Sequence, residues 1–341
     1  MTVPVINKTG ENDRDITEGS RILIKYTNDV AIKFCQEGDK TPQEFLDFGR
    51  SSYAEISQKW QGEVIPLRNV ETFTVPSSNP LKEQESDHAI PVRLYQNGTP
   101  ETPLIFFVHG GGWSRGDLET HDNLCRHLCQ KTGYNVLAVD YRLAPENPFP
   151  CGLNDVLSAY DWCIENHKTL QIKPNQIFVA GDSGGGNLVT ALVMALRQRK
   201  QAIHPLGLLL IYPALDLRIR GDEFVYDEGY FLSRDRIDIL VKCYVQNRLD
   251  EVDFNPLLSP LLASDLENFP PVVIVSAQID PLQPETEAFA RKLRENGNDV
   301  RCISVHGVIH TFAQFFGLFP EAEGAVAFMA DQLKGIYGAQ K

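Results

Sequence analysis

The stretch that decides the fold is Ile177-Phe-Val-Ala-Gly-Asp-Ser-Gly-Gly-Gly-Asn-Leu188. Residues 177–180 form a short apolar run typical of a buried strand, and residues 188–196 are typical of a buried helix. Between them the chain fits the G-x-S-x-G pattern, which places a serine on a sharp turn from strand to helix. Gly181 and Gly185 would allow the two backbones to approach closely. The pattern predicts Ser183 as a nucleophile exposed at a strand end.

A glycine-rich turn that binds a nucleotide is the alternative interpretation of this stretch. The phosphate-binding pattern G-x-x-x-x-G-K-[ST] requires lysine and then serine or threonine after the last glycine. Asn187 and Leu188 occupy those positions. This particular phosphate-binding pattern therefore fails. A plain glycine-rich turn stays as the alternative, and the strand before the turn and the helix after it favour the serine elbow.

Apolar runs and helical stretches alternate on both sides of this turn. Such alternation predicts a mostly parallel sheet of about eight strands that is covered by helices on both faces. Residues 63–75 and 88–95 alternate in polarity and are expected to form an antiparallel opening pair. The parallel strands are predicted at residues 104–108, 135–140, 177–180, 206–211, 271–277 and 299–305, and the helices near 119–131, 152–167, 187–199, 283–296 and 320–336.

Two segments do not fit the alternation of strand and helix. Residues 1–62 are predicted to form a helical cap segment, and residues 213–269 a cap insertion that contains a helix at 235–246. The catalytic domain would then consist of residues 63–212 and 270–341. An insertion after a strand, at the edge where ligands bind, is expected to act as a lid. We expect both segments to pack together over the site.

A triple glycine follows the first parallel strand, in His109-Gly-Gly-Gly-Trp113. Consecutive glycines can turn their N–H groups into a cavity, which is what stabilisation of a developing oxyanion requires. The N–H of Gly184, directly after the serine, would add a further donor. A plain flexible loop is the alternative, and the serine elbow argues against it. His109 lies inside this loop and is interpreted as structural.

A serine nucleophile needs a base, and in this type of sheet the base follows the serine in the chain. Three histidines do so. His204 precedes a strand, at the wrong edge of the sheet, and His306 ends the last strand. His310 lies in the following loop and could reach over Ser183, so it is the predicted base, with His306 as the alternative.

The acid that orients the base should also follow a strand. Asp280 lies at the carboxyl end of the strand predicted at 271–277 and is followed by proline, which would fix the turn. It is the predicted acid, and Asp216 after the preceding strand is its rival. Glu285, one turn further on, is expected to be a solvated helix residue.

Together these motifs resemble the hormone-sensitive-lipase family of esterases, which has the α/β-hydrolase fold. The likeness runs from about residue 63 to the C-terminus. The motifs that carry it are His109-Gly-Gly-Gly-Trp113, Asp140-Tyr-Arg-Leu-Ala-Pro-Glu146, Gly181-Asp-Ser-Gly-Gly-Gly186, Asp280-Pro-Leu and Gly307-Val-Ile-His310. In the second motif, Asp140 or Glu146 could fix the elbow or the glycine loop by hydrogen bonds.

The resemblance implies Ser183 as nucleophile, His310 as base and Asp280 as acid, with Gly111, Gly112 and Gly184 as oxyanion donors. Asp227-Glu-Gly-Tyr230 is similar to the same region of bacterial acetyl esterases. The sequence departs from the family pattern at three positions. Gly184 replaces the usual alanine, Pro284 an acidic residue, and Thr311 the usual glycine. None of these departures removes a reacting group.

The net charge of −13 argues against nucleic-acid and anionic-membrane partners, because no basic surface is supplied. No apolar run approaches the length of a membrane span, and the first residues lack the apolar core of a signal peptide. Seven scattered cysteines indicate reduced thiols and a cytoplasmic protein. Family likeness suggests a homodimer formed through the last strand and helix.

The sequence thus predicts a carboxylic-ester hydrolase that acts on short acyl chains through a serine acyl-enzyme, with no metal or organic cofactor. An amidase, deformylase or lactonase with the same machinery is the first alternative. The second is a small-molecule receptor of the same fold, although such receptors lack the base. The substrate is expected to contact Trp113, Tyr212, Phe231 and Leu257, with Phe34 and Phe45 from the N-terminal helices.

Overall fold

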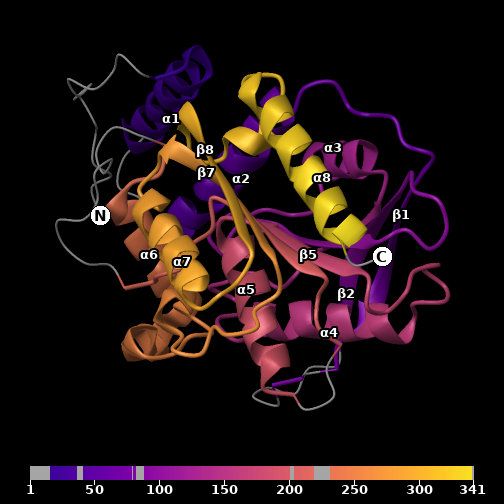
Figure 1. Cartoon of the computed structure of the whole chain (residues 1–341). Coiled ribbons are helices and arrows are strands. Elements are labelled where there is room, and N and C mark those ends of the chain that lie inside the picture. Colours follow the sequence, from indigo (N-terminus) through magenta and orange to yellow (C-terminus); the bar gives the residue numbers. More distant parts are fainter. Residues whose placement is uncertain are drawn as a thin grey trace.

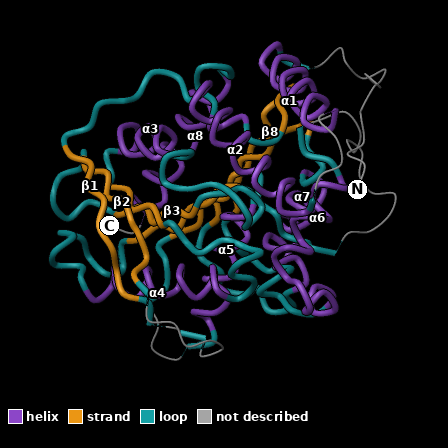
Figure 2. Tube along the Cα trace, turned by 180° about the vertical axis from the view of Figure 1, so that it is seen from behind, coloured by secondary structure: helices purple, strands orange, loops and turns teal. Residues whose placement is uncertain are grey.

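The computed structural model describes residues 16–36, 41–78, 80–81, 88–199, 203–218 and 231–339. An eight-stranded sheet crosses the molecule with the strand order β1-β2-β4-β3-β5-β6-β7-β8 (Figures 1 and 2). The strands are β1 (Asn69–Pro76), β2 (Ala89–Gln96), β3 (Leu104–Val108), β4 (Asn135–Val139), β5 (Ile177–Asp182), β6 (Gly207–Ile211), β7 (Val272–Ile279) and β8 (Val300–Ile309).

The first two strands pair antiparallel, and β2 pairs antiparallel with β4, while all later pairings are parallel. Every residue of β3, β4, β5 and β6 is buried. Continuous apolar runs form such strands because both faces of a parallel sheet are covered. The predicted α/β-hydrolase fold is confirmed, including the antiparallel opening pair.

Helices cover both faces of the sheet. Figures 1 and 2 show α3 (Asp122–Thr132) and α8 (Glu321–Ala339) on one face, with α4 (Cys151–Glu165) and α5 (Gly184–Arg197) on the other. The helix α7 (Gln283–Glu295) packs on β7 and β8. The helix α5 begins at Gly184, earlier than the predicted start near residue 187, so the three glycines form its first turn.

The described parts of the two predicted cap segments, residues 1–62 and 213–269, contain helices. The helices α1 (Glu18–Gln36) and α2 (Pro42–Trp60) precede the sheet, and α1 is tied to the last strand by the Ser20 hydroxyl, which donates to Gly307 O at 3.0 Å. Between β6 and β7 lie α6 (Arg234–Val245) and the 3₁₀ helices η3 (Gln246–Asp253) and η4 (Pro260–Leu262). A lid role for these segments, their division into domains and dimerisation through β8 and α8 stay predictions.

In the part of the chain that the structure describes, no helix combines the length and apolarity that a membrane crossing requires. The Asp227-Glu-Gly-Tyr230 motif lies outside the described residues.

Candidate active site

Ser183 lies at the turn between β5 and α5 with backbone angles φ 52° and ψ −119°. A positive φ is strained for a serine and persists only where the surroundings fix it. Close packing at two glycines provides that constraint. A Cβ on Gly181 would lie 2.5 Å from the carbonyl carbon of Gly185, and a Cβ on Gly185 would lie 2.1 Å from Val108 O. Only glycine fits at both positions, so the elbow depends on them.

The structure brings Ser183, His310 and Asp280 together from three strand ends. His310 Nε2 lies 2.8 Å from Ser183 Oγ, and His310 Nδ1 lies 2.6 Å from Asp280 Oδ2. The backbone N–H of Leu282 donates to Asp280 Oδ1 at 2.9 Å, which fixes the carboxylate. His310 and Asp280 are both buried. The arrangement matches a hydroxyl, a base and an orienting acid within hydrogen-bonding reach.

The alternative residues lie elsewhere. His306 is exposed on β8 and His204 is exposed before β6. Asp216 faces Arg218, whose Nε donates to its carboxylate at 2.7 Å. The structure therefore places His310, rather than its rivals, against the serine, and Asp280, rather than Asp216, against His310.

The expectation of a solvated Glu285 is wrong. Its Oε1 accepts the backbone N–H of Leu215 at 2.6 Å and so anchors the loop after β6. Burial raises the pKa of Glu285 well above its usual range, and the nearby carboxylates of Asp216 and Asp280 raise it further. The helical spacing of Glu285 gave no sign of this contact, because the loop it meets is 70 residues earlier in the chain.

The glycine loop turns beside the elbow. Gly111 has φ +115° and Gly112 has φ +60°, conformations that glycine adopts without strain. Neither amide donates to another group within the described part of the chain. A Cβ on Gly184 would stand 3.3 Å from the amide nitrogen of Gly112, so the loop and the helix start converge. These amides can therefore serve an oxygen placed between them.

Asp182 joins the elbow to the loops on either side of it. This buried carboxylate accepts the Gly110 N–H at 2.7 Å and the Gln314 side-chain amide at 2.8 Å, and His121 Nε2 lies 3.2 Å away. Burial acts to raise the pKa of Asp182, but His121 and the Gly110 amide outweigh it and hold the pKa below its usual range. The residue before the nucleophile thus links the glycine loop to the loop after His310.

The N-terminal helix α2 joins this network. The Tyr53 hydroxyl donates to Gln314 Oε1 at 2.9 Å, and Arg50 Nε donates to Ser114 O at 2.8 Å. Arg50 also pairs with Glu146 at 2.7 Å. Glu146 therefore reaches the glycine loop through Arg50. Sequence reasoning missed Asp182, Gln314, Tyr53 and Arg50, and only the position of Asp182 inside the elbow motif offered a signal.

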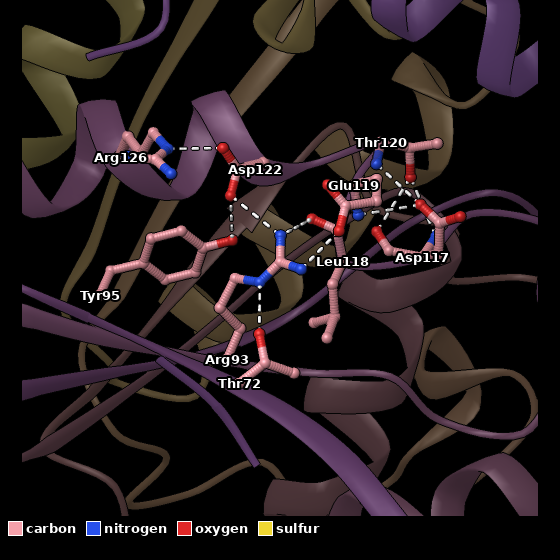
Figure 3. Close-up of polar contacts among 9 residues, drawn as sticks. All are labelled: Thr72, Arg93, Tyr95, Asp117, Leu118, Glu119, Thr120, Asp122 and Arg126. Atoms are coloured by element: carbon pink, nitrogen blue, oxygen red, sulfur yellow. Dashed lines mark hydrogen bonds and ion pairs between the residues drawn. The ribbon is translucent and has the colours of Figure 1, made fainter. Parts of the chain in front are cut away.

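The segment after the glycine loop is fixed by paired charges, as Figure 3 shows. The carboxylate of Asp117 accepts the Thr120 N–H at 2.7 Å and closes the turn. A terminal nitrogen of Arg93, on β2, lies 3.1 Å from Asp122 Oδ1, and Arg93 also forms an ion pair with Glu119. Arg126 pairs with the other oxygen of Asp122. Each arginine in this cluster has a carboxylate partner.

The comparisons with known proteins agree with this architecture. A family model described as "alpha/beta hydrolase fold" matches residues 105–314, which include the glycine loop, the elbow and His310. The chain belongs to this family. An ethyl acetate hydrolase of Pseudomonas putida is 34% identical over 252 residues, which cover 72% of this chain and 79% of that protein. An arylesterase of Saccharolobus solfataricus is 34% identical over 78% of this chain and 86% of its own length.

Solved structures of esterases share the fold of this α/β hydrolase. An esterase of Pyrobaculum calidifontis superposes with a TM-score of 0.80 at 29% identity, covering 94% of this chain and 99% of the other. An ester hydrolase from the metagenome of Lake Arreo gives a TM-score of 0.82 at 27% identity, covering 95% and 99%. The resemblance to the hormone-sensitive-lipase family of esterases is confirmed.

The described residues of this α/β hydrolase enclose a cavity of about 40 Å³ over Ser183 and His310. Tyr53 of α2 and Arg115 of the glycine loop lie on one wall. Most of the other lining side chains are apolar and come largely from the cap insertion and the glycine loop: Trp113, Phe231, Leu232, Ile237, Leu240 and Leu282. The N-terminal helix α2 and the insertion therefore both contribute to the pocket.

Two of the predicted substrate contacts, Trp113 and Phe231, line this cavity, and the other four do not. Tyr212 is buried against His310, with their ring centroids 4.8 Å apart. Leu257 packs against the core. Phe34 and Phe45 contact each other between α1 and α2, with ring centroids 5.4 Å apart. Helical spacing did not by itself decide whether these two phenylalanines face the site or each other, and in the structure they contact each other.

Two departures from the family pattern have local explanations. Pro284 lies in the first turn of α7, where its missing N–H costs no hydrogen bond. Thr311 follows His310 in a left-handed conformation, with φ 74°. Its hydroxyl donates to His310 O at 2.5 Å.

Proposed function

We propose that this α/β hydrolase cleaves carboxylic esters of small acyl groups through an acyl-enzyme on Ser183. The observation that carries the proposal is the continuous hydrogen-bonded series Ser183 Oγ, His310 and Asp280, with distances of 2.8 and 2.6 Å. Proteins similar to this chain include an ethyl acetate hydrolase and an arylesterase, which supports ester bonds as the target.

The geometry supports a two-step reaction. His310 Nε2 takes the proton of Ser183 as Oγ attacks the ester carbonyl, and Asp280 stabilises the imidazolium that forms. His310 then protonates the leaving alcohol, which breaks the C–O bond and leaves the acyl group on Ser183. A water molecule deprotonated by His310 attacks this acyl-enzyme, and the acid is released with Ser183 restored.

The oxyanion of each tetrahedral intermediate would lie among the N–H groups of Gly111, Gly112 and Gly184. The first two amides have no partner in the described residues, so stabilising the charge breaks no existing hydrogen bond. Losing one such donor typically costs about 10²- to 10³-fold in kcat. The cavity of about 40 Å³ supports a preference for small acyl groups.

The test is a panel of 4-nitrophenyl esters from acetate to octanoate, with a matched amide and a lactone. We expect the highest kcat/KM for the shortest acyl groups and slow turnover of the amide. Ser183→Ala should lower kcat by about 10⁴- to 10⁶-fold, because the nucleophile is lost. His306→Ala is the control and should retain activity.

Rapid acid quench during turnover should trap a protein whose mass is increased by one acyl group on Ser183. Turnover that survives Ser183→Ala, or a trapped acyl group on another residue, would overturn the mechanism. If the amide or the lactone were hydrolysed with a higher kcat/KM than every ester, the proposed substrate class would be wrong.

A further inference from the structure

Arg115, in the wall of the active-site cavity, is a cation without a counter-charge among the residues that the structure describes. It lines the cavity together with Ser183 and His310, and its Nε is buried without a hydrogen-bond partner. No carboxylate of the described residues lies within ion-pairing distance of its guanidinium. Its guanidinium lies over the ring of Tyr53, whose centroid is 5.3 Å from Arg115 Cζ.

A second arginine approaches the same wall from the cap insertion. Arg236 of α6 directly precedes Ile237, which lines the cavity. One of its terminal nitrogens donates to Phe231 O at 2.6 Å, and it has no carboxylate partner among the described residues. Burial and, to a smaller extent, repulsion from Arg115 lower the pKa of Arg236 to about 10.

Other arginines of the chain, in contrast, are paired with carboxylates. Arg93 and Arg126 share Asp122 (Figure 3), Arg142 pairs with Asp155 at 2.8 Å, and Arg50 pairs with Glu146. The chain carries 45 acidic residues against 32 basic ones, so carboxylates are abundant. Leaving a partly buried cation unpaired costs free energy, and a ligand that brings the missing anion recovers it.

We propose that Arg115, assisted by Arg236, binds a carboxylate of the substrate, so that the preferred esters of this hydrolase are anionic. The planar guanidinium presents paired N–H donors that match a carboxylate, which fixes the ester as well as attracting it. The inference rests on the proposed esterase function. It assigns the carboxylate to the ester substrate itself, on either its acyl half or its alcohol half.

Two matched pairs of small esters distinguish the two halves. Monomethyl succinate against methyl butyrate places the carboxylate on the acyl half, and 4-acetoxybenzoate against methyl 4-acetoxybenzoate places it on the alcohol half. We expect kcat/KM for the anionic ester to exceed that for its neutral partner in one pair. Arg115→Met should lower that anionic-to-neutral ratio by about 10- to 100-fold, the usual range for a hydrogen bond to a charged group.

Arg236→Met should lower the same ratio by a smaller factor, because Arg236 acts from the neighbouring helix. The matched control is Arg301→Met, since Arg301 is paired with Asp299 on the far strand β8. It should leave the ratio unchanged. Added salt should raise KM for the anionic ester more than for the neutral one.

Two results would overturn the inference while ester hydrolysis stands. One is a higher kcat/KM for the neutral ester in both pairs. The other is an equal loss of kcat/KM for the anionic and the neutral ester in Arg115→Met, which would make Arg115 a packing residue. If no ester is hydrolysed, the proposed function fails, and calorimetry decides the inference separately. Ser183→Ala should bind monomethyl succinate or 4-acetoxybenzoate at least 10-fold more tightly than Ser183→Ala/Arg115→Met, and equal affinities would overturn it.

Discussion

The polar groups at the edge of the sheet and those in the pocket wall differ in whether they have hydrogen-bond partners. At the edge, His310 is hydrogen-bonded through both ring nitrogens, and Asp182 through both carboxylate oxygens. In the wall, Arg115 Nε and Trp113 Nε1 are buried and have no hydrogen-bond partner in the part of the chain that the structure describes. Partnered groups have one orientation and suit one chemistry, whereas unpartnered groups are left for a ligand. We infer that the edge determines the reaction and the wall selects the substrate.

The largest effect should come from the acid at the edge. Asp280→Asn should lower kcat for 4-nitrophenyl acetate by about 10⁴-fold, because an amide favours the wrong tautomer of the base. Asp216→Asn is the matched control at the neighbouring strand end and should change kcat only slightly. Circular dichroism would verify that both variants fold. Similar losses in the two variants would contradict the assignment of Asp280.

The next effect concerns the glycines that hold the elbow. Gly185→Ala should lower the free energy of unfolding by about 3 kcal/mol, because the strand backbone cannot move away from the new Cβ. That Cβ would lie 2.1 Å from Val108 O. At Gly184 the nearest atoms are 3.3 Å away, so Gly184→Ala should cost less than about 1 kcal/mol. Urea unfolding measures the free energy of unfolding of both variants. Equal losses would show that Gly185 is not packed more tightly than Gly184.

A smaller effect should follow at the junction between the edge and α2. Tyr53→Phe removes the hydroxyl that orients Gln314, and through it Asp182 and the glycine loop. We expect kcat for 4-nitrophenyl acetate to fall about 5-fold, in line with one neutral hydrogen bond, while KM hardly changes. Tyr26→Phe is the control, because the Tyr26 hydroxyl bonds Glu55 at the surface. A change in KM alone would make Tyr53 a binding residue.

The smallest effect concerns Glu285 and depends on pH. Its pKa is raised in the folded protein, so the native state holds a proton that the unfolded chain loses as pH rises above the ordinary value of about 4.3. The associated stability is present at low pH and is lost as pH rises. Glu285→Gln keeps an acceptor for the Leu215 N–H, so it should gain stability relative to wild type between pH 5 and pH 8.

Urea midpoints at the two pH values measure this gain. The exposed Glu287 on the same helix provides the control, and Glu287→Gln should show no such dependence on pH. A parallel response of wild type and Glu285→Gln would contradict the raised pKa of Glu285.

Local pattern was sufficient to predict the strands, their mostly parallel sheet and the residues that meet at its edge. The carboxyl ends of parallel strands gather at one edge, so a serine, an acid and a histidine that each follow a strand must approach one another. Ser183, Asp280 and His310 could therefore be selected from chain order alone, and only the choice against His306 and Asp216 needed further argument.

Contacts between distant segments could not be predicted in this way. Glu285 is an ordinary position on an amphipathic helix until the loop after β6 packs against it, and Phe34 and Phe45 could face the site or each other with the same helical spacing. The sequence around Arg115 does not show that its guanidinium lacks a carboxylate partner among the described residues. That depends on which side chains the other segments place next to it. By itself the sequence determined the fold and the reacting groups through periodicity and chain order. Tertiary structure alone decided which polar groups found partners, because burial and pairing depend on neighbours that are remote in the chain.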